Sequence, residues 1–82
     1  MLTQANCGLC DHAKEVLHRV AADYPLDVRV VDLASRGGQA LAVQGGILFP
    51  PGVFLDGQPF SYGRVSEGKL RRELARRGAE RN

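Results

Sequence analysis

The chain has 82 residues, which is enough for one small domain and too few for two. No apolar run approaches the roughly 20 residues that cross a bilayer, and the first residues lack the basic and apolar segments of a secretory signal. We therefore expect a single domain over residues 1–82 that has no membrane partner and works in the cytoplasm.

The net charge of +2 conceals a basic C-terminal part. Positions 64–82 carry seven basic residues against Glu67, Glu73 and Glu80. The basic residues are Arg64, Lys69, Arg71, Arg72, Arg76, Arg77 and Arg81. No aromatic side chains interleave with these charges as a platform for nucleic-acid bases would require. We interpret the segment as a solvated helix face with cations near the helix C-terminus, and we do not expect nucleic acid as a partner.

The first half of the chain predicts a strand, a helix and a second strand. Residues 2–4 form a short strand, and Asn6 is a suitable N-cap for the helix that follows. Apolar residues recur at three- and four-residue steps over positions 9–21, which predicts an amphipathic helix of about four turns. Pro25 limits its extent. Positions 26–31 alternate and are rich in β-branched residues, which is typical of a strand.

The second half predicts a helix, a hairpin and a last helix. Ser35 is a candidate cap for a short helix that ends at Gly45-Gly46. Positions 52–55 form an apolar strand, Asp56-Gly57 is a two-residue hairpin turn, and the return strand covers 58–62. Pro59 lacks an N–H donor and therefore suits a sheet edge, and Ser66 begins the final helix.

The order β-α-β-α-β-β-α indicates the α/β class. A right-handed crossover makes the first two strands parallel, and the late hairpin adds an antiparallel pair. We therefore expect a four-stranded mixed sheet flanked by helices on both faces.

The two cysteines, Cys7 and Cys10, form a CxxC motif at the start of the first helix. Thiols one helical turn apart can close into a disulfide with little backbone movement, and a thiol at a helix start faces the positive end of the dipole, which favours its thiolate. A bridge over so short a loop removes little unfolded-state entropy, so the pair is better suited to chemistry than to stabilisation. An inert cysteine pair is the alternative. We expect His12 and His18 to be solvated.

Three blocks of the sequence resemble the thioredoxin superfamily, and glutaredoxin-like proteins in particular. They are Asn6-Cys7-Gly8-Leu9-Cys10-Asp11, Pro51-Gly52-Val53-Phe54-Leu55-Asp56-Gly57, and Gly63 followed by Ser66. The resemblance implies a thioredoxin-like fold and a thiol–disulfide oxidoreductase in which Cys7 attacks and Cys10 resolves. It implies a monomer that needs no cofactor and no metal, and that acts on a disulfide-containing protein or a small thiol substrate. Glutathione or another low-molecular-weight thiol is the candidate reductant.

The resemblance also implies a substrate-binding surface, formed by Pro50, Pro51, Gly63, Arg64 and Ser66. Pro51 matches the family's cis-proline beside the thiols. The residue before it normally offers its N–H and C=O to an extended substrate, but Pro50 has no N–H. A shift of one residue would make Pro50 the cis residue and Phe49 the donor, although the spacing back from the hairpin turn favours Pro51. Ser66 and the amides at the helix start offer an anion site, and Arg64 adds positive charge nearby.

Two other functions stay open. Zinc and iron–sulfur sites need about four ligands, so metal or cluster binding would require a dimer or borrowed thiols. Leu9, where glutaredoxins usually have an aromatic residue, leaves a cluster-bridging dimer conceivable. A non-catalytic adaptor that uses the basic last helix is the second alternative.

Overall fold

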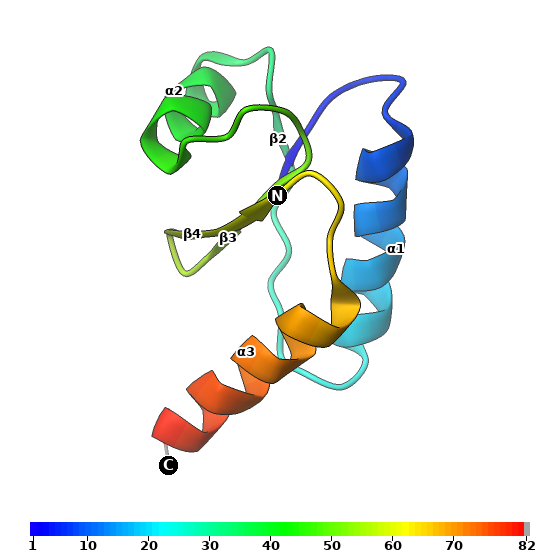
Figure 1. The fold of residues 1–82 in the computed structure, drawn as a ribbon, viewed down its shortest axis with the longest axis vertical. Helices are drawn as coiled ribbons and strands as arrows, with labels where there is room; N and C mark the ends of the chain where they lie inside the picture. Colours follow the sequence, from blue (N-terminus) through cyan, green and yellow to red (C-terminus); the bar gives the residue numbers. More distant parts are fainter. Residues whose placement is uncertain (82) are drawn as a thin grey trace.

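A computed structural model describes residues 1–81, with side chains up to Gly78. The elements follow in the predicted order (Figure 1). They are β1 (Leu2–Thr3), α1 (Gly8–Ala21), β2 (Val31–Asp32), α2 (Arg36–Gly45), β3 (Gly52–Leu55), β4 (Gln58–Tyr62) and α3 (Glu67–Arg81). The strands form one four-stranded sheet in the order β2-β1-β3-β4, in which β1 is parallel to β2 and antiparallel to β3. The predicted α/β class with a mixed sheet is confirmed, and the fold is thioredoxin-like.

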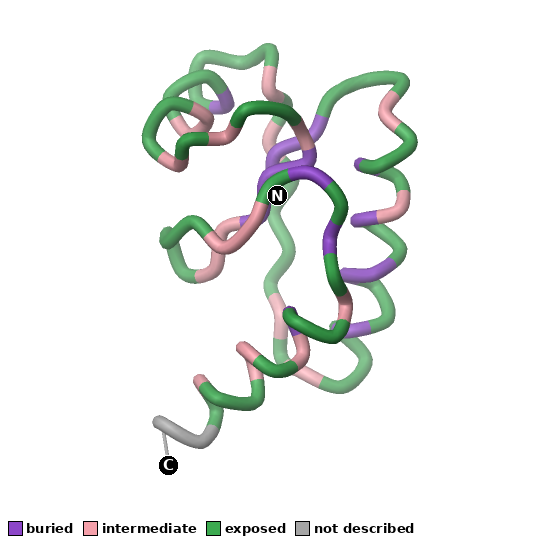
Figure 2. Tube along the Cα trace, viewed as in Figure 1, coloured by how far each residue is buried: buried purple, intermediate pink, exposed green. Residues whose placement is uncertain are grey.

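Helices lie on both faces of the sheet, as the sequence predicts. α1 and α3 contact each other, whereas α2 packs against β1 and β2. Successive side chains of a strand point to opposite faces, so the side chains of Val53 and Phe54 of β3 pack on opposite sides of the sheet. Val53 belongs to the buried core with α1 and α3, and the ring of Phe54 lies close to Gly45 of α2. Figure 2 shows the buried residues on the inward side of α1 and in the central strands.

The core on the α1 side follows from the amphipathic pattern of that helix. Its buried members are Ala13, Val16, Leu17, Val20, Val53, Val65 and Leu70. Each large apolar side chain removed from water contributes about 1.5–3 kcal/mol. Cys10 lies on the same helical stripe and is itself buried, which places one thiol of the CxxC motif against the core.

The second strand is shorter than the sequence predicts. Positions 26–31 were expected to pair, but only Val31–Asp32 do so, opposite Leu2 and Thr3 of β1. Each ladder residue needs a partner across the strand, and β1 has only two residues, so the pairing ends at Leu2. Val28 and Val30 are consequently 44% and 52% exposed. The strand prediction was therefore wrong for five of its six positions.

The turns and caps agree with the sequence. Asp56 and Gly57 both have positive φ, at 49° and 81°, as a two-residue hairpin turn requires. β4 is an edge strand and therefore accommodates Pro59. The Ser35 side chain accepts a hydrogen bond from the Gly38 N–H at 3.0 Å at the start of α2. Gly46, which follows the last residue of α2, is left-handed and caps the helix.

Ion pairs connect the start of α3 to α1 and to the residues that follow α1. Glu67 accepts hydrogen bonds from Arg19 at 2.9 Å and from Arg71 at 3.0 Å, and Arg71 also reaches Asp23 at 2.7 Å. Hydrogen bonds from the two arginines lower the pKa of Glu67, because they favour its charged form. These contacts neutralise part of the basic C-terminal charge within the protein itself.

A second group of charges lies further along α3. Hydrogen bonds from Arg76 and Arg77 lower the pKa of Glu73 to about 2. The side chains of Glu80 and Arg81, which belong to the predicted charged face, lie outside the described residues. No helix within the described part of the chain is long and apolar enough to cross a membrane.

Candidate active site

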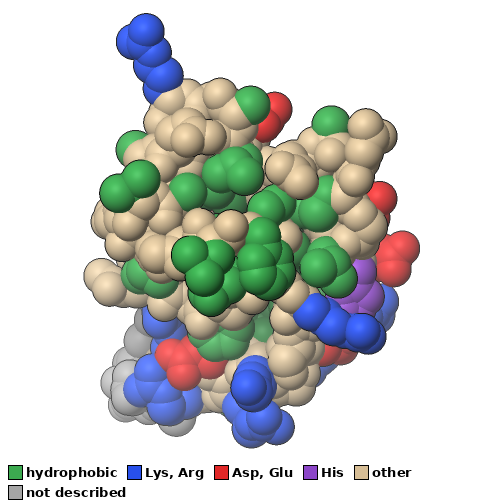
Figure 3. Space-filling view, turned by 45° about the horizontal axis from the view of Figure 1, so that its top comes forward, with side chains coloured by type: hydrophobic (Ala, Val, Ile, Leu, Met, Phe, Trp, Pro, Cys, Tyr) green, Lys and Arg blue, Asp and Glu red, His purple; other side chains and the backbone are tan. Residues whose placement is uncertain are grey.

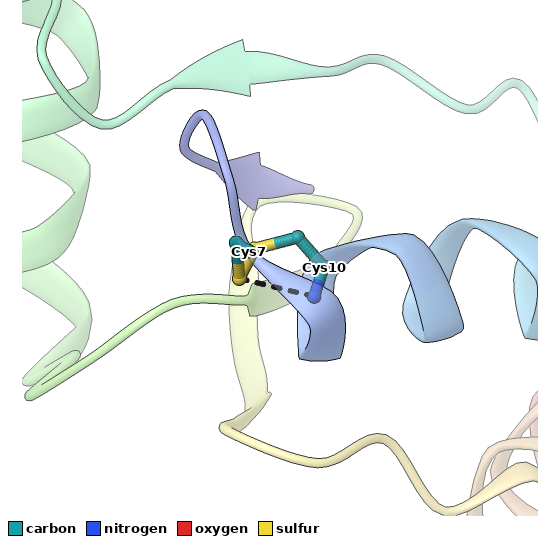
Figure 4. Close-up of a disulfide and its surroundings, with 2 residues drawn as sticks. All are labelled: Cys7 and Cys10. Atoms are coloured by element: carbon teal, nitrogen blue, oxygen red, sulfur yellow. Dashed lines mark hydrogen bonds between the residues drawn. A yellow bond between two sulfur atoms is a disulfide. The ribbon is translucent and has the colours of Figure 1, made fainter.

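Cys7 and Cys10 form a disulfide at the first turn of α1, with their Cα atoms 5.1 Å apart (Figure 4). Cys7 is the N-cap residue, with extended backbone angles of −119° and 104°. The prediction that Asn6 caps the helix is therefore wrong by one position. Asn6 takes a left-handed conformation with φ of 53°, which asparagine tolerates better than most residues, and the helix begins after Cys7.

The shift of the cap by one residue gives the sulfur of Cys7 a specific environment. The backbone N–H of Cys10 donates a hydrogen bond to the Cys7 Sγ at 3.1 Å. A side-chain acceptor at the N-cap normally satisfies this N–H, and the positive end of the helix dipole lies at the same place. In the reduced protein the same donor and the same dipole would stabilise negative charge on the Cys7 sulfur.

The two thiols differ in access. Cys7 is half-buried, whereas Cys10 is 1% exposed and faces the core. A substrate disulfide can therefore approach the sulfur of Cys7 from solvent, while Cys10 is reached only through Cys7. This asymmetry is the arrangement that a nucleophile and a resolving thiol require.

The segment that enters β3 lies beside the disulfide. Figures 1 and 4 both show the chain between α2 and β3 passing the start of α1. The peptide bond between Pro50 and Pro51 is cis, so Pro51 is the cis residue, as predicted, and the register shifted by one residue is excluded. Pro51 is buried, and Pro50, which has no N–H, offers only its carbonyl to a bound chain.

Gly63 is held next to this proline. Its N–H donates to the Pro51 carbonyl at 2.8 Å, so the structure brings two of the predicted substrate-binding residues together. Gly63 has φ of 75°, and a Cβ at this position would lie 2.7 Å from the ring of Phe49. Glycine is therefore favoured here for both its backbone conformation and its lack of a side chain.

An aromatic pair beside these residues was not identified from the sequence. The rings of Phe49 and Tyr62 meet edge to face, with centroids 5.3 Å apart. The hairpin register pairs Gly52 with Tyr62, which brings the segment before β3 opposite the end of β4. Pairing residues outward from the Asp56-Gly57 turn is the sequence signal that could predict which residues of the two strands are opposite each other. An irregularity between Val53 and Phe54 shifts this pairing, so the sequence alone does not place Tyr62 opposite Gly52.

The remaining predicted residues have simpler surroundings. Ser66 accepts a hydrogen bond from the Lys69 N–H at 3.3 Å and so caps α3 as predicted, and Arg64 is exposed.

The two histidines of α1 were both expected to be solvated. His18 is exposed, but the prediction for His12 is wrong. His12 is half-buried, and its Nδ1 is buried without a hydrogen-bond partner among the described residues. It lies one turn before the buried Val16, so the helix turns part of its ring inward.

Several large apolar side chains in the motif and in the segments around the hairpin are exposed. Figure 3, in which the top of Figure 1 comes forward, shows hydrophobic side chains gathered on one face with most charged groups around them. Leu9 inside the motif is 40% exposed, Phe49 is 50% exposed and Tyr62 is 40% exposed. Leu48 is 79% exposed. Large exposed apolar groups close together are typical of a contact surface.

The fold, the CxxC disulfide at a helix start and the cis-proline segment together define a thioredoxin-fold protein of redox type. A family model described as "Glutaredoxin-like domain (DUF836)" matches residues 1–75, and the chain belongs to this family. Uncharacterized proteins of Mycobacterium tuberculosis and Mycobacterium bovis are 34% identical over 79 residues, which cover 93% of this chain and 80% of each relative. No solved structure matches the chain significantly. Family membership and the CxxC pair support a thioredoxin-type redox role at the level of the family.

Proposed function

We propose that the protein is a thiol–disulfide oxidoreductase that reduces disulfides through Cys7 and Cys10. The observation that carries the proposal is the asymmetry of the CxxC pair. Cys7 is accessible, lies at the N-cap of α1 and accepts a backbone N–H, whereas Cys10 is buried within bonding distance of it.

The reaction consists of two exchanges. The Cys7 thiolate attacks one sulfur of a substrate disulfide, forms a mixed disulfide and releases the other sulfur as a thiolate. Cys10 then loses its proton and attacks the Cys7 sulfur, which forms the Cys7–Cys10 disulfide and releases the second substrate thiolate. Two electrons pass to the substrate. Two equivalents of a reducing thiol, with glutathione or another low-molecular-weight thiol as the candidate class, restore the dithiol.

The surroundings favour a protein disulfide as substrate over a small charged one. Leu9 within the motif and the Phe49–Tyr62 pair beside Gly63 are exposed apolar side chains, and they would contact an apolar stretch of a client. Pro50 supplies a carbonyl without an N–H, so a bound chain would gain only one backbone hydrogen bond there. Arg64 and the capped start of α3 remain the candidate contacts for an anionic thiol.

We place this reaction in the cytoplasm, because a reducing compartment keeps a CxxC pair in its active dithiol form. We assign it to a monomer, because one chain carries both thiols. No further cofactor is needed, since the two thiols carry both electrons.

Turnover with a protein disulfide tests the proposal. Insulin reduction is followed with a thiol reductant for the unmodified protein, Cys7→Ser and the control His18→Gln, which changes an exposed residue on the polar side of α1. We expect no turnover above background with Cys7→Ser and full turnover with the control. Equal activity of Cys7→Ser and the unmodified protein would overturn the assignment.

Removing one ring of the Phe49–Tyr62 pair tests whether the substrate is a protein disulfide or a small one. Phe49→Ala is expected to reduce kcat/KM for insulin by about tenfold, on the order of the 1–2 kcal/mol that a buried interface aromatic contributes, and to change kcat/KM for a small disulfide little. Val28→Ala is the matched control, since Val28 is similarly exposed but lies beside the second half of α1.

A further inference from the structure

A buried hydroxyl group at the end of β1 has no hydrogen-bond partner. Thr3 is 9% exposed and is the only polar residue among the buried side chains that the structure describes. Its carbonyl accepts from the Leu33 N–H at 2.7 Å, but its Oγ1 atom is paired with no donor or acceptor of the described chain. An unpaired buried hydroxyl costs free energy, and valine would fill nearly the same space without that cost. The presence of threonine here therefore needs an explanation.

The register of the sheet places the Thr3 side chain on the face that α1 covers. Opposite residues of an antiparallel pair point to the same face, and successive residues of a strand alternate. Leu2 is opposite Gly52, and a Cβ on Gly52 would meet the side chain of Ile47, which follows α2. Leu2 and Gly52 therefore face α2. Thr3 faces the other side, where Val53 packs in the core with α1 and α3.

Thr3 also lies at the end of β1 that leads to the CxxC motif. Gln4-Ala5-Asn6 connect it to Cys7, and Figure 4 shows this short connection running from β1 into the disulfide. The next pair in the register of β1 and β3 is Thr3 with Pro51, the cis-proline beside the disulfide. The ring of Pro51 has no polar atom, so the hydroxyl gains no hydrogen bond from it.

Cys10 is the residue of α1 that can supply a partner. Met1, two residues before Thr3 on the same face, lines a cavity together with Leu17, further along α1. The strand and the helix therefore run in opposite directions, and Thr3 lies toward the first turn of α1. The first buried residue there is Cys10, which is 1% exposed. The buried residues of α1 are Cys10, Ala13, Val16, Leu17 and Val20, and only the first has a side-chain atom that accepts hydrogen bonds.

We propose that the Thr3 hydroxyl donates a hydrogen bond to the Cys10 sulfur once the disulfide is open, and thereby speeds the attack of Cys10 on the mixed disulfide. This inference rests on the proposed function. In the disulfide form the Cys10 sulfur is bonded to Cys7. Breaking that bond frees the sulfur to turn about its Cα–Cβ bond toward the sheet. A thiolate that is removed from water needs a donor, and hydrogen bonds to charged groups are the stronger ones.

The hydroxyl acts in the second exchange alone. The Cys10 thiol gives its proton to solvent, and its sulfur anion attacks the Cys7 sulfur. The bond between Cys7 and the substrate then breaks, and its electron pair leaves on the substrate thiolate. Thr3 keeps its own proton and donates to the Cys10 sulfur while that atom is negative. Cys7 has a separate donor, the Cys10 N–H at 3.1 Å, so the first exchange does not depend on Thr3.

Two releases of thiol from one small disulfide test the proposal. Reduced protein is mixed rapidly with up to one equivalent of the chromogenic disulfide DTNB, each half of which is coloured when released. The first release reports the attack by Cys7, and the second reports resolution by Cys10. The first is second-order, so a high protein concentration brings it ahead of the second. Thr3→Val is expected to slow the second release by about tenfold or more and to leave the first within about twofold.

Two further variants serve as controls. Thr3→Ser retains the hydroxyl and is expected to restore the second release to within about threefold of the unmodified rate. Ser61→Ala removes a hydroxyl that is also buried without a partner among the described residues. Ser61 belongs to β4, which β3 separates from β1, so both releases should be unchanged. The disulfide form of Thr3→Val should unfold at the same urea concentration or a higher one, because it loses no hydrogen bond there.

An equally fast second release in Thr3→Val and the unmodified protein would overturn the proposal. An equally slow one in Thr3→Val and Thr3→Ser would do the same, since the shape of the side chain and not its hydroxyl would then control the step. Lower stability of the Thr3→Val disulfide form would show that the hydroxyl already has a partner there, which also contradicts it. Absence of the first release in the unmodified protein would instead overturn the proposed function, and this inference with it.

Discussion

The substitution Gly63→Ala tests two reasons why glycine is favoured at this position: its left-handed backbone and the space that the Phe49 ring occupies. The left-handed φ of 75° costs a residue with a Cβ about 1–2 kcal/mol. The new Cβ would also lie 2.7 Å from the Phe49 ring, so the half-exposed ring must turn away. Losing its edge-to-face contact with Tyr62 costs about 0.5–1.5 kcal/mol more. We therefore expect the free energy of unfolding to fall by about 1.5–3.5 kcal/mol, measured by urea denaturation.

Gly57→Ala is the matched control, because Gly57 has φ of 81° and no atom within 4 Å of its expected Cβ. Only the backbone cost of about 1–2 kcal/mol applies there. In a Phe49→Ala background the two glycine substitutions should cost the same, since the ring that distinguishes them has gone. An undiminished difference in that background would refute the reasoning, as would equal costs in the unmodified protein.

Three further predictions concern the thiols and α3. In the reduced protein at pH 7, iodoacetamide should modify Cys7 well before Cys10, because Cys10 is 1% exposed, and peptide mass mapping detects the order. Folding lowers the pKa of Glu73 from 4.5 to about 2, so its stabilising contribution is present above pH 4.5 and is lost as the pH falls toward 2. In Glu73→Gln the urea midpoint should depend less on pH over that range. The same pH dependence as in the unmodified protein would contradict the ion-pair account. Ser66→Ala should lower the free energy of unfolding by about 1 kcal/mol through loss of the cap on α3, and no loss in urea denaturation would show that the cap is not stabilising.

Local chemistry explains which parts of the fold could be predicted from the sequence. The Asp56-Gly57 turn, the Ser35 cap and the apolar stripe of α1 depend on neighbouring residues alone, and all three are as expected. The cis bond at Pro51 follows from a resemblance carried by a whole block of sequence. The strand at positions 26–31 depends instead on a partner from elsewhere in the chain, and β1 offers only two residues.

The site illustrates the same division. The CxxC spacing revealed both thiols, but the identity of the cap depended on the conformation of Asn6, whose left-handed φ moves the helix start by one residue. The Phe49–Tyr62 pair required the hairpin register, which an irregularity between Val53 and Phe54 displaces. Local sequence patterns therefore did not predict which residues of distant strands lie opposite each other.

Trapping of the mixed disulfide tests the central claim most directly. Reduced Cys10→Ser is mixed with an excess of a protein disulfide, and intact mass spectrometry with peptide mapping locates any adduct. The account predicts one covalent adduct, on Cys7, that persists because no resolving thiol is present, and none with reduced Cys7→Ser over the same time. An adduct on Cys10 in Cys7→Ser at a comparable rate, or no adduct on Cys7, would contradict it.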